Sequence, residues 1–211
     1  QRYDLDTLPE LARLERGPLI DGDPAHVLYV PFDWLVWRGA RLGEPEIAAR
    51  GALLIANAVL GALAIGVFAA VLQRSGIQRF TALATALAAG TAYGYWSHVA
   101  DAFFIVPAAA SAVAAWYAAL RASGEPRGRR AWRVVAGVAL GLAVLFHQAN
   151  LLLGPALLLA ADRSSASARD RWADVLVVGT AAAAVAVPFW MLQAGAAGSS
   201  IAGLPGWFVG S

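Results

Sequence analysis

The chain has 211 residues, of which 59% are hydrophobic and only 14% charged, with a formal net charge of +2. Soluble domains carry about 25% charged residues, so this composition is typical of a membrane protein. Cysteine is absent, which excludes disulfides, thiolate nucleophiles and cysteine-based metal sites. The sequence also lacks a glycine-rich phosphate loop, HExxH and Gly-x-Ser-x-Gly. Its arginine clusters sit in short loops, so we expect no nucleic-acid partner.

Residues 1–50 differ from the rest because they hold nine acidic residues and six arginines. Leu8, Leu11 and Leu14 recur at helical spacing and predict a short amphipathic helix, which Gly17-Pro18 ends. The aromatic run from Val27 to Trp37 is too short to span a bilayer. Since Trp and Tyr favour the headgroup zone, we expect an interfacial helix there, in a loop outside the membrane.

Residues 51–211 are predicted to form a transmembrane helical region. About 20 apolar residues cross the ~30 Å hydrocarbon core of a bilayer. On this basis the expected spans are about 51–72, 80–98, 102–120, 134–147, 150–161 and 173–191. The chain begins at Gln1 without an initiator Met or a signal peptide. We therefore expect it to be an internal piece of a longer protein, incomplete at both ends.

The stretch from Val134 to Ala161 is uncharged over 28 residues. One straight helix of that length would measure about 42 Å, which is too long for a bilayer. Arginine-rich loops occupy 73–80, 121–133 and 162–172, and such loops collect on the cytoplasmic side. All three share that side only if the stretch is broken near 147–150. A break there places residues 1–50, the turn at 101 and the break itself on the extracytoplasmic side.

Acidic residues at a membrane boundary are candidates for function. Asp4 and Asp6 precede the amphipathic helix, and a solvated acidic loop is their simpler interpretation. Asp101 is the only charged residue between Arg79 and Arg121, and it follows His98 by three positions. A plain turn is the alternative for Asp101.

His147, Gln148 and Asn150 form a second polar group, inside an apolar stretch. Burying them unpaired would cost about 1–3 kcal/mol each. They therefore either satisfy the ends of a broken helix or hold an anionic headgroup, with free helix N-termini adding donors. His26 is an interfacial histidine whose simpler role is contact with water. A metal at Asp101, His98, His26 and His147 would require these side chains to converge.

Several short motifs stand in a recognisable order. Residues 4–13 have the spacing Asp-x5-Glu-x-Ala-Arg, 24–34 are an aromatic interfacial segment, and 43–50 read Gly-Glu-x-Glu-x-Ala-x-Arg. An aromatic helix end at 96–101 carries an acidic residue, and 141–150 begin Gly-Leu-Ala-x-Leu. This order resembles the integral-membrane glycosyltransferases of the GT-C type, including bacterial protein mannosyltransferase and lipid A aminoarabinose transferase homologues. The resemblance covers nearly the whole chain.

The resemblance implies an all-α, GT-C-like transmembrane bundle in a bacterial inner membrane. It implies transfer of a sugar from a polyprenyl-phosphate donor to a lipid, glycan or protein acceptor at the extracytoplasmic face. Asp4, with Asp6 as its substitute, would be the general base. Asp101 with His98 would bind the acceptor or a divalent metal; no other cofactor is expected. His147 and Gln148 would meet the donor phosphate, with His26 and Asn150 as further substrate-binding residues.

Two other interpretations stay open. The first is a transporter or flippase of a lipid-linked or anionic substrate, because broken helices with polar residues near mid-membrane also mark secondary transporters. Against it, the acidic residues cluster in an external loop, and no internal repeat is apparent. A non-catalytic membrane subunit of the same fold is the other.

Overall fold

The computed structural model of the chain describes residues 27–100, 105–161 and 167–196, together with Leu14 and Gly198. Within these residues every regular element is a helix and no strand occurs, so the predicted all-α class is confirmed. The helices are α2 (Tyr29–Gly43), α3 (Ala49–Arg74), α4 (Arg79–Thr91), α5 (Tyr93–Ala100), α6 (Ile105–Gly124), α7 (Arg129–Phe146), α8 (Leu153–Ala161) and α9 (Ala168–Ala196). Two short 3-10 helices, η1 (Pro126–Gly128) and η2 (Gln148–Leu152), precede α7 and α8.

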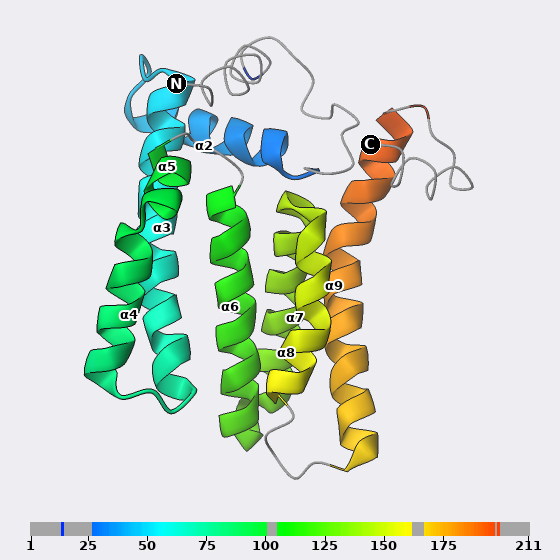
Figure 1. The fold of residues 1–211 in the computed structure, drawn as a ribbon. Coiled ribbons are helices and arrows are strands. Elements are labelled where there is room, and N and C mark those ends of the chain that lie inside the picture. The colour runs from blue at the N-terminus through cyan, green and yellow to red at the C-terminus, as the bar shows by residue number, and fades with distance from the viewer. Residues whose placement is uncertain (1–13, 15–26, 101–104, 162–166, 197, 199–211) are drawn as a thin grey trace.

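The long helices stand side by side in one bundle, and α2 lies across one end of it (Figure 1). α6 packs on α7, α7 packs on α9, and α3 contacts both α4 and α6. Among the described residues, three helices are long and apolar enough to cross a membrane, namely Ala49–Arg74, Ile105–Gly124 and Arg169–Ala196. They support the prediction of a membrane protein.

The chain reverses direction between α7 and α8, at the place where the arginine pattern predicts a break. α7 therefore runs toward the end of the bundle where α2 lies, and α8 runs back from it (Figure 1). As a result, the ends of α3, α6 and α8 and the starts of α4, α7 and α9 share the opposite end of the bundle, which we call the arginine end (Figure 1). We call the other end, with α2, η2 and the last turns of α9, the α2 end.

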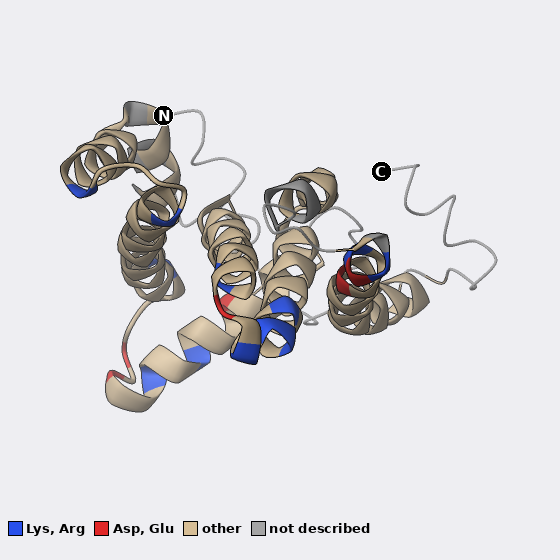
Figure 2. Ribbon diagram, turned by 90° about the horizontal axis from the view of Figure 1, so that it is seen from below, with Lys and Arg blue, Asp and Glu red and all other residues tan. Residues whose placement is uncertain are grey.

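The arginine end holds nine described arginines and three described acidic residues. Figure 2 views the bundle from this end and shows blue segments at the near ends of several helices. The arginines are Arg74, Arg79, Arg121, Arg127, Arg129, Arg130, Arg133, Arg169 and Arg171. The acidic residues are Glu125, Asp170 and Asp174.

The predicted span 80–98 is not one continuous helix. α4 ends at Thr91, Ala92 has extended backbone angles (φ −61°, ψ 137°), and α5 begins at Tyr93. Gly90 and Gly94 flank this point, and glycine lowers helix stability by roughly 1 kcal/mol relative to alanine. α5 is held by the Tyr95 hydroxyl, which donates to the Gly61 carbonyl oxygen of α3 at 2.7 Å. The predicted spans 51–72 and 173–191 lie inside α3 and α9, and the described part of 102–120 lies inside α6. The spans 134–147 and 150–161 correspond to α7 and to η2 with α8.

α7 and α9 approach each other closely along two glycines. A Cβ atom on Gly137 would overlap the carbonyl oxygen of Val178, and one on Gly141 would lie 2.7 Å from that of Ala182. The two glycines are four residues apart and share one face of α7. Small residues at this spacing let helix backbones pack tightly in membranes, where van der Waals contact drives helix association.

The predicted interfacial helix corresponds to α2, which is fastened to the bundle at its beginning. The Leu28 amide donates to the Leu145 carbonyl oxygen of α7 at 3.1 Å. Phe32 meets Phe146 edge to face, with ring centroids 5.1 Å apart. At its other end, the Trp37 indole donates to the Ile47 carbonyl oxygen at 3.2 Å, just before α3. The predicted amphipathic helix around Leu8 and Leu11 lies outside the described residues.

Candidate functional site

The break between α7 and η2 is centred on His147, whose backbone is extended (φ −157°, ψ 115°). The His147 amide still donates to the Ala143 carbonyl oxygen at 3.0 Å, completing the last turn of α7. The Asn150 amide donates to the His147 carbonyl oxygen at 3.0 Å, which starts the next turn. The backbone therefore changes direction at one residue without leaving these groups unpaired.

Two of the three polar side chains at the break satisfy backbone groups. Asn150 Nδ2 donates to the Ala143 carbonyl oxygen at 2.9 Å. His147 Nδ1 accepts a hydrogen bond from the Ala149 amide at 3.4 Å and so caps η2. Since Nδ1 accepts this hydrogen bond, a ring hydrogen of His147 belongs on Nε2. The simpler interpretation, in which these residues satisfy the broken helix ends, describes His147 and Asn150 well.

Gln148 differs from its two neighbours. Its Oε1 atom is buried and accepts no hydrogen bond from any part of the chain that the structure describes. A buried acceptor without a donor costs about 1–3 kcal/mol, so a donor from a ligand would be stabilising here. Of the polar group at the break, Gln148 is the residue whose hydrogen-bonding capacity the fold leaves open.

An apolar groove lies between α7, α8 and α9 and encloses about 520 Å³. Its floor is the tight α7–α9 contact, where Gly141 and Ala182 both line the cavity. Leu151 and Leu152 of η2 line it next to the break. On α9 the lining runs from Val175 to Trp190, about 22 Å at the helical rise. The groove is therefore long enough to follow an extended lipid chain through most of a bilayer.

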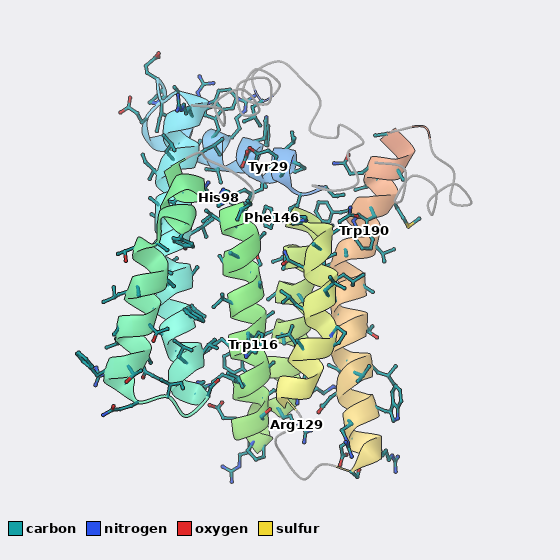
Figure 3. The ribbon with its side chains drawn as sticks, in the orientation of Figure 1. Tyr29, His98, Trp116, Arg129, Phe146 and Trp190 are labelled. Atoms are coloured by element: carbon teal, nitrogen blue, oxygen red, sulfur yellow. The ribbon has the colours of Figure 1, made fainter. Side chains whose placement is uncertain are left out.

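The remaining predicted site residue among the described ones is His98, which lies at the α2 end. His98 is half-buried near the end of α5, and Figure 3 shows it at the same end of the bundle as Phe146 and Trp190. The predicted site residues Asp4, Asp6, His26 and Asp101 lie outside the described residues. Within the described ranges, no group of three or more His, Asp or Glu could hold a metal. The metal site at Asp101 and His98 stays a prediction.

Sequence reasoning missed an ion-pair cluster at the arginine end. Arg129 and Arg133 of α7 both bind Asp174 of α9, with nitrogen–oxygen distances of 2.5 and 3.1 Å. Asp174 falls inside the predicted span 173–191, and a charge at that position is the signal that a partner from a neighbouring helix was needed. The pKa of the Arg133 guanidinium is lowered from its usual value, chiefly because the group is buried. The charge of Asp174 raises this pKa, and the charge of neighbouring Arg129 lowers it. Because arginine starts from so high a pKa, Arg133 stays charged.

A second cluster at this end joins α6 to the start of α7. Glu125 pairs with Arg121 at 2.5 Å and accepts a hydrogen bond from the Trp132 indole at 3.1 Å. The Arg121 guanidinium also lies over the Trp132 ring, 4.9 Å from its centroid. Glu125 is therefore fully engaged by its own neighbours.

No protein-family model matches this chain, and neither a curated protein nor a solved structure shows significant similarity to it. The part of the chain that the structure describes is a helical bundle in which three helices are long and apolar enough to cross a membrane. Its distinguishing feature is an apolar groove that ends beside a polar helix break.

Proposed function

We propose that this chain belongs to a GT-C-type glycosyltransferase, which moves a sugar from a polyprenyl phosphate to a lipid, glycan or protein acceptor. The observation that carries the proposal is the groove between α7, α8 and α9, which is apolar along its length and reaches η2. A polyprenyl tail would lie in this groove. Its phosphate and sugar would then meet the polar group at the break.

The distribution of arginine supports an orientation for the proposal. Arginine-rich loops favour the cytoplasm, so the arginine end would face the cytoplasm of a bacterial inner membrane. The α2 end, with η2 and His98, would then face the extracytoplasmic side. A donor lipid entering from the bilayer would present its headgroup on that side.

The chemistry would be divided among few side chains. His147 would donate from Nε2 to a phosphate oxygen of the donor, and Gln148 Oε1 would accept a hydroxyl hydrogen of the sugar. Asn150 would position the break through its bond to Ala143. Asp4 or Asp6 would take the proton from the acceptor hydroxyl. Asp101 with His98 would bind the acceptor or a divalent metal, and His26 would add a substrate contact.

Filling the groove tests the proposal. A Cβ atom on Gly179 meets nothing within 4 Å, and Gly179 lines the groove. Gly179→Phe should therefore fill the groove without disturbing α9. Gly66 in α3 also has open space around it and lines none of the described cavities, which makes Gly66→Phe the matched control.

Native mass spectrometry of the protein, purified from its own membranes, reports the bound lipid. We expect a polyprenyl phosphate or its sugar conjugate in the wild type and in Gly66→Phe, and much less of it in Gly179→Phe. Bulk phospholipid alone, or equal occupancy in both variants, would contradict the proposal. Unchanged sugar transfer after joint replacement of Asp4 and Asp6 would remove both residues from the mechanism.

A transporter or flippase is the second candidate, favoured by the interruptions at Ala92 and His147. Discontinuous helices form ion and substrate sites in many secondary transporters. Reconstituted vesicles separate the two functions. Uptake that depends on a proton or sodium gradient, without sugar transfer, would support the transporter and remove the transferase.

A further inference from the structure

Arg129 and Arg133 carry more positive charge than their surroundings compensate. Both guanidiniums bind the same carboxylate oxygen, Oδ2 of Asp174. The other described acidic residues at the arginine end are engaged elsewhere. Glu125 pairs with Arg121, and Asp170 accepts hydrogen bonds from the Ser167 amide and hydroxyl at the start of α9. Asp170 also feels the charge of Arg129, but the ion pairs of Arg129 and Arg133 are both made with Asp174. Among the described residues, two cations therefore share one directly bound carboxylate.

Hydrogen-bond donors are also left over. The Nε atoms of Arg129 and Arg133 are both buried and have no hydrogen-bond acceptor among the described residues. The Arg133 side chain is only 2% exposed, so water cannot readily compensate it. A buried charge is stable only when it is paired and its donors are satisfied. An additional anion would supply what is missing.

The start of α7 is a further feature that would favour a bound anion. α7 begins at Arg129, and its N-cap residue, Gly128, makes no side-chain capping bond. The first amide groups of a helix have no partner within the helix, and the helix dipole favours an anion at this end. The first turn of α7 contains no acidic residue.

We propose that Arg129 and Arg133 bind the phosphate of an anionic phospholipid, in the leaflet at the arginine end. A lipid is the source that the surroundings favour, because Asp174 is followed directly by Val175, which lines the apolar groove. The phosphate would sit at the guanidiniums, and an acyl chain would enter the lower part of the groove. This site does not depend on the proposed glycosyltransferase activity, since it needs only the cluster and the groove.

Lipid titrations of the protein test the site. Phosphatidylglycerol, phosphatidylcholine and inorganic phosphate are compared by native mass spectrometry and by thermal unfolding in detergent. We expect phosphatidylglycerol to bind and raise the unfolding temperature, with phosphatidylcholine much weaker. Equal binding of the two lipids would overturn the proposal. An equal rise with inorganic phosphate alone would assign the site to a free anion and overturn the lipid.

Three variants sharpen the result. Arg129→Gln should weaken phosphatidylglycerol binding roughly tenfold, the loss of one charge-assisted bond. Asp174→Asn should strengthen it, because the competing carboxylate loses its charge while its shape is kept. Arg127→Gln removes the same charge from an exposed residue of η1 and should leave binding unchanged. Weaker binding in Asp174→Asn, or equal loss in Arg127→Gln and Arg129→Gln, would overturn the site.

Discussion

Gln193, near the end of α9, donates a hydrogen bond from Nε2 to the carbonyl oxygen of Val27 at 3.1 Å, across 166 residues of sequence. Gln193 is 2% exposed, and Val27 is buried with Leu145 and Ala186 in one apolar cluster. The segment that leads into α2 is therefore held by α7 and α9 together. This contact fixes α2 over the end of the bundle where the helix break lies.

Gln193→Ala should lower the free energy of unfolding by about 1–3 kcal/mol, because the Val27 carbonyl oxygen would lose its buried donor. Thermal unfolding in detergent measures the change. Gln73→Ala removes an exposed glutamine from α3 and serves as the control. A similar loss in both variants would show that the bond to Val27 is not the cause.

Gly137→Leu should disrupt the contact between α7 and α9, since even a Cβ atom would overlap the Val178 carbonyl oxygen. Overpacking of this kind costs about 1–3 kcal/mol or more. Gly66→Leu places the same side chain in open space on α3 and should cost far less. Unfolding by titrated SDS compares the two, and equal stability would contradict the observed helix packing.

Asn150→Ala and Gln148→Leu should affect the break in opposite ways. The Asn150 change removes a bond to the Ala143 carbonyl oxygen and should cost about 1 kcal/mol of stability. The Gln148 change removes an acceptor that has no described partner, so stability should stay equal or rise. If donor binding falls only in Gln148→Leu, the loss comes from a lost ligand contact. Destabilisation by Gln148→Leu would mean that the residue is structural.

Single cysteines can report the topology, since the chain contains none of its own. Gly124→Cys and Arg169→Cys flank α7 and α8, and the reversal at His147 places both at the arginine end. We expect a membrane-impermeant maleimide to label them from the same side, and Ala149→Cys from the other. Labelling of Gly124→Cys and Arg169→Cys from opposite sides would exclude the reversal.

The helical fold and the reversal of the chain between α7 and α8 could be predicted from the sequence, because they follow from the lengths of the apolar runs and the positions of the arginines. The apolar run 51–72 predicts α3, which extends from Ala49 to Arg74. The reversal near 147–150 follows from the requirement that three arginine loops share one side. Both arguments depend on the membrane acting as a uniform solvent, which constrains every helix in the same way.

The hydrogen-bond partners of individual side chains could not be predicted from the sequence. Nothing local distinguishes Asn150, which caps α7, from Gln148, whose Oε1 has no described partner. That difference depends on which carbonyl oxygens the folded chain brings within reach. The start of α9 was a missed local signal, because Ser167 and Asp170 form a capping pair ahead of the predicted span. The interruption at Ala92 depends on tertiary contacts of α5 with α3.

The bond between Gln193 and Val27 also bears on the order in which the protein assembles. Pairs such as α3 with α4 and α6 with α7 are consecutive in the sequence and can associate as soon as they leave the ribosome. The start of α2 can pack on α7 through Leu28 and Phe32, but the hydrogen bond to Val27 needs Gln193, which lies in the last turn of α9. The α2 end of the bundle is therefore completed only when nearly all of the described chain has been made.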